Sequence, residues 1–398
     1  MEKNCIRKSA IPAVVILSLA LAFRQMSMTI VMPFISTYCR SLIGYTSLYA
    51  GLAVGIFGLM QAVFQIPFGM FSDRYGNKLI MLIGLTQVVV GLILAYFAKN
   101  ISLLIFARAL QGSGAIIGVG YSWAASIAGE KERIRAMSIL GAFVSAAAAL
   151  AFALGPLLRE IIPVNWMFLF CAALLFLNEI YILFFIKDNK NKNEIRQNVP
   201  ESKHIRTIFH NKSFIVMNLS AFINNYMMVS VFYAVPIYLT KVTGETGMWK
   251  VFIPAIVVAI FIMKLAVRLR QKGFNKQILM AAFLISALSL ILYFNKTSYS
   301  FLLIGTTLFM CGYIIIATFV ATNVNEAVED SYRGTANGIF NSFQYIGNFA
   351  GAVLTGALWG ISEKLTWFVT IGIGIAGFLI IVSDTKYQEP VKEEENVQ

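Results

Sequence analysis

Long apolar runs separated by short polar connections make up almost the whole chain. An apolar helix of about 18 to 20 residues is long enough to cross the hydrocarbon core of a bilayer. By this criterion the pattern predicts twelve transmembrane helices, at residues 10–37, 46–71, 79–98, 101–127, 136–158, 164–186, 213–239, 248–268, 277–294, 299–323, 335–359 and 364–383. The expected fold class is therefore all-α and integral to a membrane.

One longer polar stretch divides these spans into two sets of six. The expected parts are an N-terminal six-helix bundle at 1–186, a linker at 187–212, a C-terminal six-helix bundle at 213–384 and a tail at 385–398. The linker is either a plain connection or contains an amphipathic surface helix at 201–209. The glutamate-rich tail is expected to be disordered.

The two halves resemble each other weakly. Residues 133–137 open the fifth span much as residues 332–336 open the eleventh, and the charged loop at 69–78 has a counterpart at 268–276 that lacks its acid. Paired six-helix repeats with a substrate site near the membrane midplane are typical of transporters.

Composition supports the membrane class. Of the 398 residues 58% are hydrophobic and 13% charged, with a mean hydropathy of +0.74, whereas soluble proteins average about 25% charged residues. The net charge of +13 does not indicate nucleic-acid binding, because bases in a membrane protein usually mark its cytoplasmic side. The four cysteines are scattered without a C-x-x-C pair, so no disulfide framework, metal site or cofactor is expected.

The basic residues also predict the orientation. With both termini inside, 23 of the 32 lysines and arginines lie in the termini, in the even-numbered loops or, for Lys264 and Arg268, in the adjoining end of a span, and two lie deeper within spans. The odd-numbered loops hold only seven, namely Arg40, Lys99, Arg159, Lys241, Lys250, Lys296 and Lys364. The positive-inside rule therefore predicts cytoplasmic N- and C-termini. Residues 3–22 resemble a signal peptide, but apolar character resumes to residue 35, which favours an uncleaved first span.

The loop between the second and third spans is a short, charged turn bounded by glycines. Gly69 permits close helix packing and Gly76 a left-handed turn. Arg74 and Lys78 can reach lipid phosphates. Asp73 is the expected functional residue, stabilised by a helix N-terminus or an arginine. Alternatively, these charges only set the topology.

The fourth span contains Arg108, Gln111, Gly112 and Gly114 in the pattern R-x-x-Q-G-x-G. An arginine several residues inside a span is costly, so it is expected to face a polar cavity or a carboxylate. The alternative is that Arg108 extends toward the outer surface.

Both patterns resemble motifs of the major facilitator superfamily of transporters, the loop matching G-x-x-x-D-[RK]-x-G-x-[RK]. The resemblance implies alternating access, with Asp73 bridging the halves only when the cytoplasmic side is closed. Arg133 and Arg135 are the arginines on which such a gate would rest. Gly155 and Pro156 end a run that resembles a reduced form of the Gly-Pro motif of exporters, and Pro156 can bend the helix end.

Polar residues elsewhere in the spans are candidates for a cavity or for proton coupling. Arg24 in the first span is too costly to face lipid unpaired, and Glu179 in the sixth is the deepest carboxylate, unless it merely extends to the interface. Gln61 and Asn225 are expected to line a substrate pathway, or to join helices at about 1 kcal/mol each.

Longer stretches at 55–69 and 108–116 resemble the drug:proton antiporter branch of the superfamily. A member of that branch has an extra soluble domain after the twelfth span, for which this chain is expected to have no room. The usual second base of the loop is Asn77 here, and the acid expected near the end of the fourth span is Ser126. Losing both members of a charge pair together destabilises a protein less than losing one, because no unpaired buried charge is left.

The expected function is proton-coupled efflux of small amphipathic or cationic compounds by a monomer in the bacterial inner membrane, with lipids, protons and the small-molecule substrate as partners. The alternatives are transport of a specific metabolite such as a sugar or amino acid, a membrane enzyme, and a receptor that does not transport. An enzyme would need paired aspartates or a His–Asp constellation, and a receptor a sizeable soluble domain. The sequence shows neither.

Overall fold

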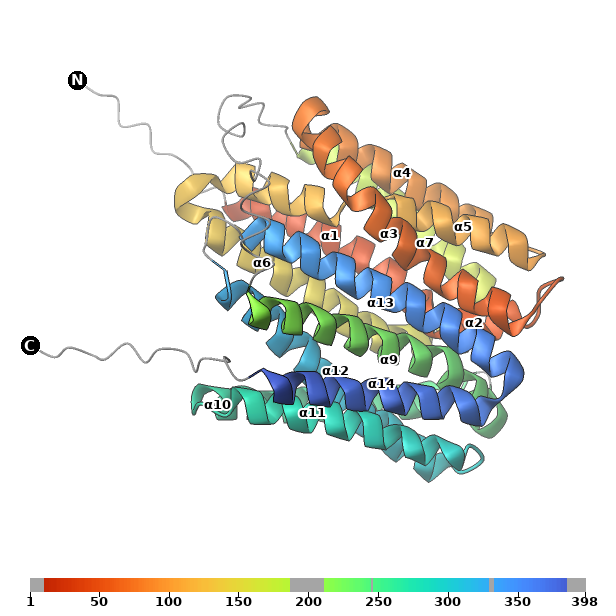
Figure 1. The fold of residues 1–398 in the computed structure, drawn as a ribbon. Helices are drawn as coiled ribbons and strands as arrows, with labels where there is room; N and C mark the ends of the chain where they lie inside the picture. The colour runs from red at the N-terminus through yellow and green to blue at the C-terminus, as the bar shows by residue number, and fades with distance from the viewer. Residues whose placement is uncertain (1–10, 187–210, 245, 329–332, 385–398) are drawn as a thin grey trace, which may run out of the picture. The chain divides into compact units, whose positions relative to one another are not determined.

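The computed structural model describes residues 11–186, 211–244, 246–328 and 333–384 (Figure 1). Inside helices, the side chains of residues 130, 131, 133, 134, 333 and 334 are not described. The predicted surface helix, the tail and all but the end of the predicted linker lie outside the described residues.

Helices account for nearly all of the described chain, and its one β pairing is an isolated bridge between Ile43 and Asn100. The first half contains α1 (Ile11–Val31), η1 (Met32–Phe34), α2 (Ile35–Cys39), α3 (Ser47–Tyr75), α4 (Asn77–Tyr96), α5 (Ile101–Ser113), α6 (Ile117–Ile161) and α7 (Val164–Phe185). The second half contains α9 (Lys212–Thr243), α10 (Trp249–Gln271), α11 (Asn275–Ser289), η3 (Leu290–Phe294), α12 (Tyr299–Glu326), α13 (Arg333–Ile361) and α14 (Glu363–Ser383).

Each predicted span coincides with a helical segment to within a few residues at either end. Among the described residues, eleven segments are long and apolar enough to cross a membrane. The remaining predicted span is α13, which is also long enough but carries amides along one face, at Asn337, Asn341, Gln344 and Asn348. The all-α membrane fold is confirmed.

Two of the spans meet within α6. Gly129 has a φ of +70° and a ψ of 176°, which interrupts the helical backbone between them. A positive φ is strained for residues with a Cβ but not for glycine. The fourth span therefore runs from Ile101 to Gly129 and the fifth from Arg135 to Ile161.

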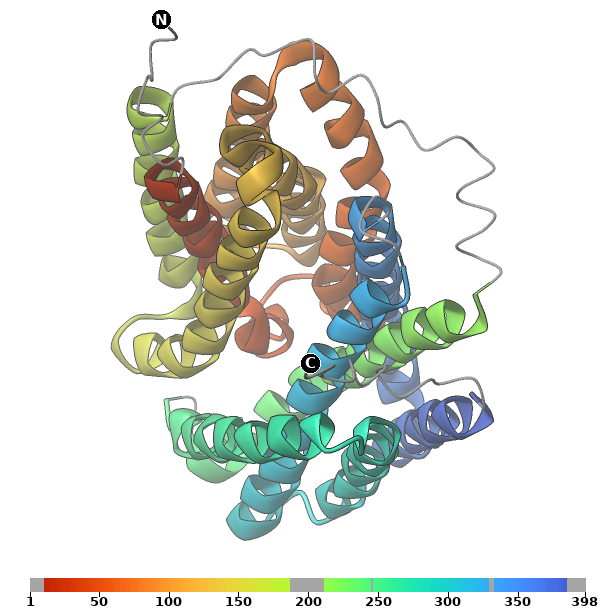
Figure 2. The same cartoon turned by 90° about the vertical axis from the view of Figure 1, so that its left-hand side faces the viewer.

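The chain divides into two compact units, one formed by residues 1–45 and 56–198 and the other by residues 46–55 and 199–398. In the first unit α1 packs most extensively against α6, and their ribbons run side by side (Figure 1, Figure 2). A Cβ at Gly155 would lie 2.7 Å from the carbonyl oxygen of Ile30. Gly155 therefore packs against the backbone of Ile30 in α1. Pro156 lies within α6 rather than at its end.

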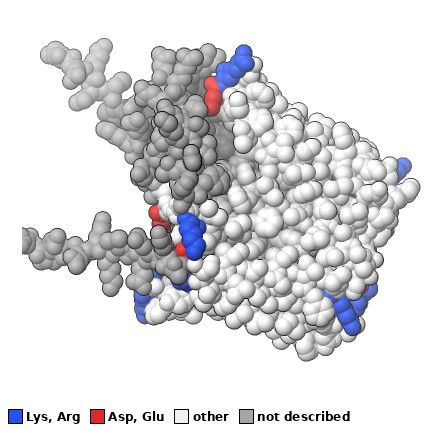
Figure 3. Space-filling view, viewed as in Figure 1, with Lys and Arg blue, Asp and Glu red and all other residues white. Residues whose placement is uncertain are grey.

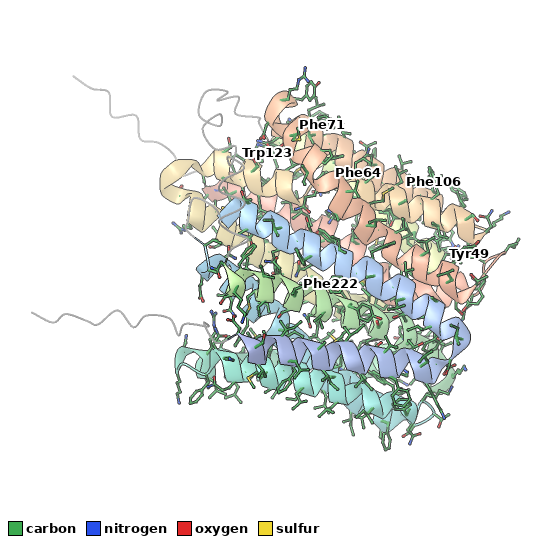
Figure 4. The ribbon with its side chains drawn as sticks, viewed as in Figure 1. Tyr49, Phe64, Phe71, Phe106, Trp123 and Phe222 are labelled. Carbon is green, nitrogen blue, oxygen red and sulfur yellow. The ribbon has the colours of Figure 1, made fainter. Side chains whose placement is uncertain are left out.

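In the second unit α9 packs most extensively against α13. A Cβ at Gly351 would lie 2.6 Å from the carbonyl oxygen of Tyr226, and a Cβ at Gly347 would collide with that of Phe222, whose side chain is labelled in Figure 4. The first turns of α3 also belong to this unit, where a Cβ at Gly55 would meet the Cβ of Ala352 at 2.9 Å. Small residues thus allow close backbone approach.

An aromatic cluster joins α9, η3, α13 and α14 of the second unit. The Tyr238 ring lies 5.5 Å from Trp359 and 6.4 Å from Trp367, and Trp367 lies 4.8 Å from Tyr293. Trp367 also donates a hydrogen bond from Nε1 to the Tyr238 hydroxyl at 3.1 Å. Both tryptophans are buried.

Charged side chains lie near the helix ends on the face shown in Figure 3, whose middle is uncharged. This distribution is the one that a bilayer requires, because an exposed charge in hydrocarbon is costly.

Candidate functional site

Five residues from α1, α3 and α5 form the polar centre of the first unit, named here the arginine cluster: Arg24, Phe57, Gln61, Arg108 and Gln111. Both arginines and both glutamines are buried, with exposed fractions of at most 3%. Three of the predicted spans therefore meet at these side chains.

Each arginine of the cluster donates to one glutamine. Arg24 Nη2 donates to Gln61 Oε1 at 2.8 Å and to the carbonyl oxygen of Gly114 at 3.5 Å. Arg108 Nη1 donates to Gln111 Oε1 at 2.5 Å, and Gln111 Nε2 donates to the carbonyl oxygen of Gly91 at 3.0 Å. Arg108 and Gln111, three residues apart in the R-x-x-Q-G-x-G pattern, are thus paired with each other.

The two guanidinium groups share one aromatic ring. The Cζ of Arg24 lies 5.9 Å from the centroid of Phe57, and that of Arg108 lies 4.8 Å from it. Arginine over an aromatic face is stabilised by about 0.5–2 kcal/mol, and more strongly where water is excluded. The Phe57 side chain is itself only partly buried, so the cluster is not enclosed on every side.

Two buried donors of the cluster have no acceptor among the described residues. They are Nε of Arg108 and Nε2 of Gln61. A buried donor without a partner costs roughly 1–3 kcal/mol. Nor does Arg108 form an ion pair with any carboxylate that the structure describes. It contacts the Gln111 amide and the Phe57 ring instead of the carboxylate that was one of its expected partners.

The two glycines of the R-x-x-Q-G-x-G pattern bring helices together around the cluster. A Cβ at Gly112 would collide with the carbonyl oxygen of Phe57 and lie 2.9 Å from its Cα. A Cβ at Gly114 would similarly collide with the carbonyl oxygen of Gly84 and reach Val88 at 2.6 Å. The first glycine therefore sets the approach of α5 to α3, and the second its approach to α4.

In the charged loop at 69–78, the structure agrees with the predicted role of Gly76 but not with that of Gly69. Gly76 has a φ of +99°, as its predicted turn requires. Lys78 Nζ donates to the carbonyl oxygen of Leu183 at 2.7 Å, near the end of α7. A Cβ at Gly69, in contrast, would meet no described atom within 4 Å. The expected close helix approach at Gly69 is therefore not present.

Asp73 is exposed and has no hydrogen-bond or ion-pair partner among the described residues. Arg74 instead lies over the ring of Tyr75, with 5.2 Å from its Cζ to the centroid. Arg135 is exposed, and the side chain of Arg133 lies outside the described residues. The gate that these residues were expected to form remains a prediction.

The counterpart loop of the second unit repeats part of this arrangement. Gly273 has a φ of +92°. Lys276 Nζ donates to the carbonyl oxygens of Val382 at 3.1 Å and Asp384 at 2.7 Å, at the end of α14. In both units a lysine thus binds the C-terminal carbonyls of the last span. Such a cation is favourable because a helix C-terminus carries partial negative charge.

The second unit also holds a charge pair beside this loop. Arg270 Nη2 donates to both carboxylate oxygens of Glu326, at 2.8 and 2.7 Å, and to Oδ1 of Asn323 at 3.0 Å. Its Cζ lies 5.3 Å from the centroid of Phe319. This charge pair was not predicted from the sequence, although the arginine and the glutamate both lie at ends of spans.

Glu179 is not part of the arginine cluster. Its Oε1 accepts a hydrogen bond from the Thr86 hydroxyl at 2.5 Å, between α7 and α4. The neighbouring side chains Phe176, Ile180 and Leu183 are exposed, so this carboxylate lies on an apolar face of the first unit.

Asn225 is buried and donates to the carbonyl oxygen of Ala221 in its own helix at 2.9 Å. The amide face of α13 was missed, although its i, i+4, i+7 and i+11 spacing is legible in the sequence. One member, Asn337, donates to Asn325 Oδ1 at 2.7 Å, and another, Asn348, keeps its buried Oδ1 without a partner among the described residues.

Comparison with known proteins places this helical pattern in a family. The family model of the Major Facilitator Superfamily matches residues 17–352. This chain belongs to the major facilitator superfamily. It is therefore a secondary transporter and a multi-pass membrane protein, which excludes the membrane-enzyme alternative.

Individual relatives agree with that membership. The chain is 26% identical over 376 residues to the inner membrane transport protein YajR of Escherichia coli (strain K12), covering 93% of this chain and 82% of YajR. It is 25% identical over 381 residues to the quinolone resistance protein NorA of Staphylococcus aureus (strain MSSA476), covering 92% and 94%. The solved structure of the nucleoside transporter NupG matches with a TM-score of 0.72 at 12% identity, covering 94% and 98%, which shows a shared fold.

Proposed function

We propose that this transporter exports small amphipathic compounds in exchange for protons, by alternating access in the bacterial cytoplasmic membrane. The observation that carries the proposal is the arginine cluster, which places two buried cations within a mostly apolar unit. Such a cluster is what a transporter needs to recognise a polar group at membrane depth. The similarity to NorA, a quinolone resistance protein, supports export, and the similarity to YajR, an inner membrane transport protein, supports the location.

Proton coupling requires a group that can bind and release a proton during transport. Of the two carboxylates predicted from the sequence to take part, Glu179 is held by Thr86 on an apolar face, whereas Asp73 is exposed and has no partner among the described residues. We therefore assign the coupling and the gate to Asp73. It changes its protonation and its partner as the cytoplasmic side opens and closes.

Inverted membrane vesicles test this function. With a pH gradient established, addition of a transported compound dissipates the gradient, and a quinolone and ethidium are suitable first compounds. Asp73→Asn is expected to abolish the effect, and Glu179→Gln to preserve most of it because glutamine keeps an acceptor for Thr86. No dissipation by the wild-type protein with any compound of a broad panel would contradict proton-coupled export.

The second candidate function is transport of a specific polar metabolite. It is favoured by the precise hydrogen bonds of the arginine cluster, because fixed donors discriminate better than an apolar wall. A radiolabelled uptake panel of sugars, amino acids and nucleosides separates the two. A single accumulated compound, with no response to quinolone or ethidium, would favour this candidate.

A further inference from the structure

The arginine cluster holds two cationic groups from different helices against a single ring. Arg24 of α1 and Arg108 of α5 both lie over Phe57, and each has a glutamine as a neutral acceptor. Placing a second guanidinium there is unfavourable unless something negative comes to the same place.

The hydrogen bonds of the cluster also have more donors than acceptors. Nε of Arg108 and Nε2 of Gln61 are buried without an acceptor among the described residues. Both groups can only donate, since neither nitrogen has a free lone pair for a hydrogen bond. What would complete the cluster is therefore an acceptor, and next to two guanidiniums an anionic acceptor is the most favourable.

The acidic side chains inside the spans of the first unit do not supply it in this structure. Glu179 is bound to Thr86 between α4 and α7. Asp73 lies near the end of α3 and Glu160 near the end of α6, and both are exposed. The missing acceptor is thus expected to come from a bound molecule.

The surroundings indicate what else that molecule carries. Phe57, on α3, is only partly buried and offers apolar surface beside the guanidiniums. Arginine binds carboxylates through two parallel N–H donors in one plane. We propose that the arginine cluster binds the carboxylate head of an amphipathic substrate, with Arg108 and Gln61 donating to its oxygens and Phe57 contacting its apolar body.

This proposal rests on the proposed export of amphipathic compounds and narrows it to acidic ones. It disfavours the cationic cargo expected from the sequence, because a cation would approach two buried guanidiniums. Binding is measured without a proton gradient, so the two proposals can fail separately. Carboxylate binding by a protein that moves no protons would contradict only the exporter proposal.

Thermal unfolding of the purified protein in detergent tests the carboxylate site. The probes are 4-phenylbutyrate, 4-phenylbutylammonium and 4-phenylbutanol, which share one body and differ in the head group, together with inorganic phosphate. We expect only 4-phenylbutyrate to raise the melting temperature of the wild-type protein. Stabilisation by the ammonium or the alcohol to the same extent would overturn the proposal, and so would an equal effect of phosphate.

Two variants identify the residues. Arg108→Gln is expected to weaken 4-phenylbutyrate binding at least about tenfold, since it removes a charge-assisted pair. Arg40→Gln, which changes an exposed arginine outside the cluster, is expected to bind like the wild type. Binding unchanged by Arg108→Gln would place the site elsewhere.

Gln61→Glu keeps the test decisive if Arg108→Gln fails to fold. The substitution preserves shape and puts a carboxylate where Arg24 already donates at 2.8 Å. We expect a higher melting temperature without ligand and no further rise with 4-phenylbutyrate, because the protein then supplies its own anion. A wild-type response to 4-phenylbutyrate in this variant would overturn the proposal.

Discussion

Gly112 shows how a single residue without a side chain controls the arginine cluster. It lies one residue after Gln111, and its backbone rests against the carbonyl and Cα of Phe57. The short distance between α5 and α3 is what lets Arg108 reach over the Phe57 ring at 4.8 Å. The geometry of the guanidinium therefore depends on the absence of a methyl group next to it.

Gly112→Ala is expected to lower the melting temperature and to weaken any ligand response of the cluster. The added Cβ meets backbone atoms, which cannot turn away as a side chain would, and overpacking of this kind costs about 1–3 kcal/mol. Thermal unfolding measures the effect. Gly372→Ala is the matched control, because a Cβ there meets no described atom within 4 Å and alanine favours a helix. If both variants unfold alike, close packing at Gly112 is not important.

The same kind of hydrogen bond, from a lysine to a helix C-terminus, joins helices in both units. Lys78 and Lys276 each follow a glycine with positive φ and donate to carbonyls at the end of the last span of their unit. The first turn of α4 is thereby tied to α7, and the first turn of α11 to α14. The weak sequence similarity between the two halves therefore corresponds to the same lysine–carbonyl contact in each unit.

Lys276→Met is expected to loosen the end of α14. Methionine keeps most of the length of the side chain but removes the charge that stabilises the helix C-terminus. Such a charge typically contributes about 0.3–1 kcal/mol at partly exposed sites. Hydrogen exchange of the amides in the last turns of α14 should increase several-fold. Lys272→Met changes an exposed lysine of the same connection and is expected to leave exchange unchanged. Equal exchange in the two variants would mean that the lysine does not support the helix end.

The membrane-spanning helices were the part of this protein that could best be predicted from the sequence. Membrane thickness fixes the length of each apolar run, and backbone groups in lipid must be satisfied within a helix, so the spans follow from length and hydropathy. Contacts between elements were less predictable. Arg24 and Arg108 were recognised as costly, but Phe57 is an ordinary apolar residue in the sequence, and only packing shows that both arginines share it. Glu179 was recognised in the sequence as the deepest carboxylate, but only the structure shows that its partner is Thr86.

At the scale of the whole molecule, orientation follows from the distribution of charge. The connection between α10 and α11 is expected to be cytoplasmic and the connection between η3 and α12 to be external. In intact cells, a membrane-impermeant maleimide should label a cysteine-free background carrying Thr297→Cys, but should label Lys272→Cys only after the cells are opened. Both positions are exposed. The reverse labelling pattern would invert the proposed topology.

The aromatic cluster of the second unit provides an intrinsic optical reporter. Trp359 and Trp367 are buried beside Tyr238 and Tyr293, so their emission should lie at short wavelength and be fed by energy transfer from the tyrosines. Trp123 (Figure 4) is buried in the first unit. With the other tryptophans replaced by phenylalanine, emission from Trp123 alone and from Trp359 and Trp367 together would follow each unit separately. Tryptophan emission then shows, without any attached dye, whether the two units unfold in one step or in two.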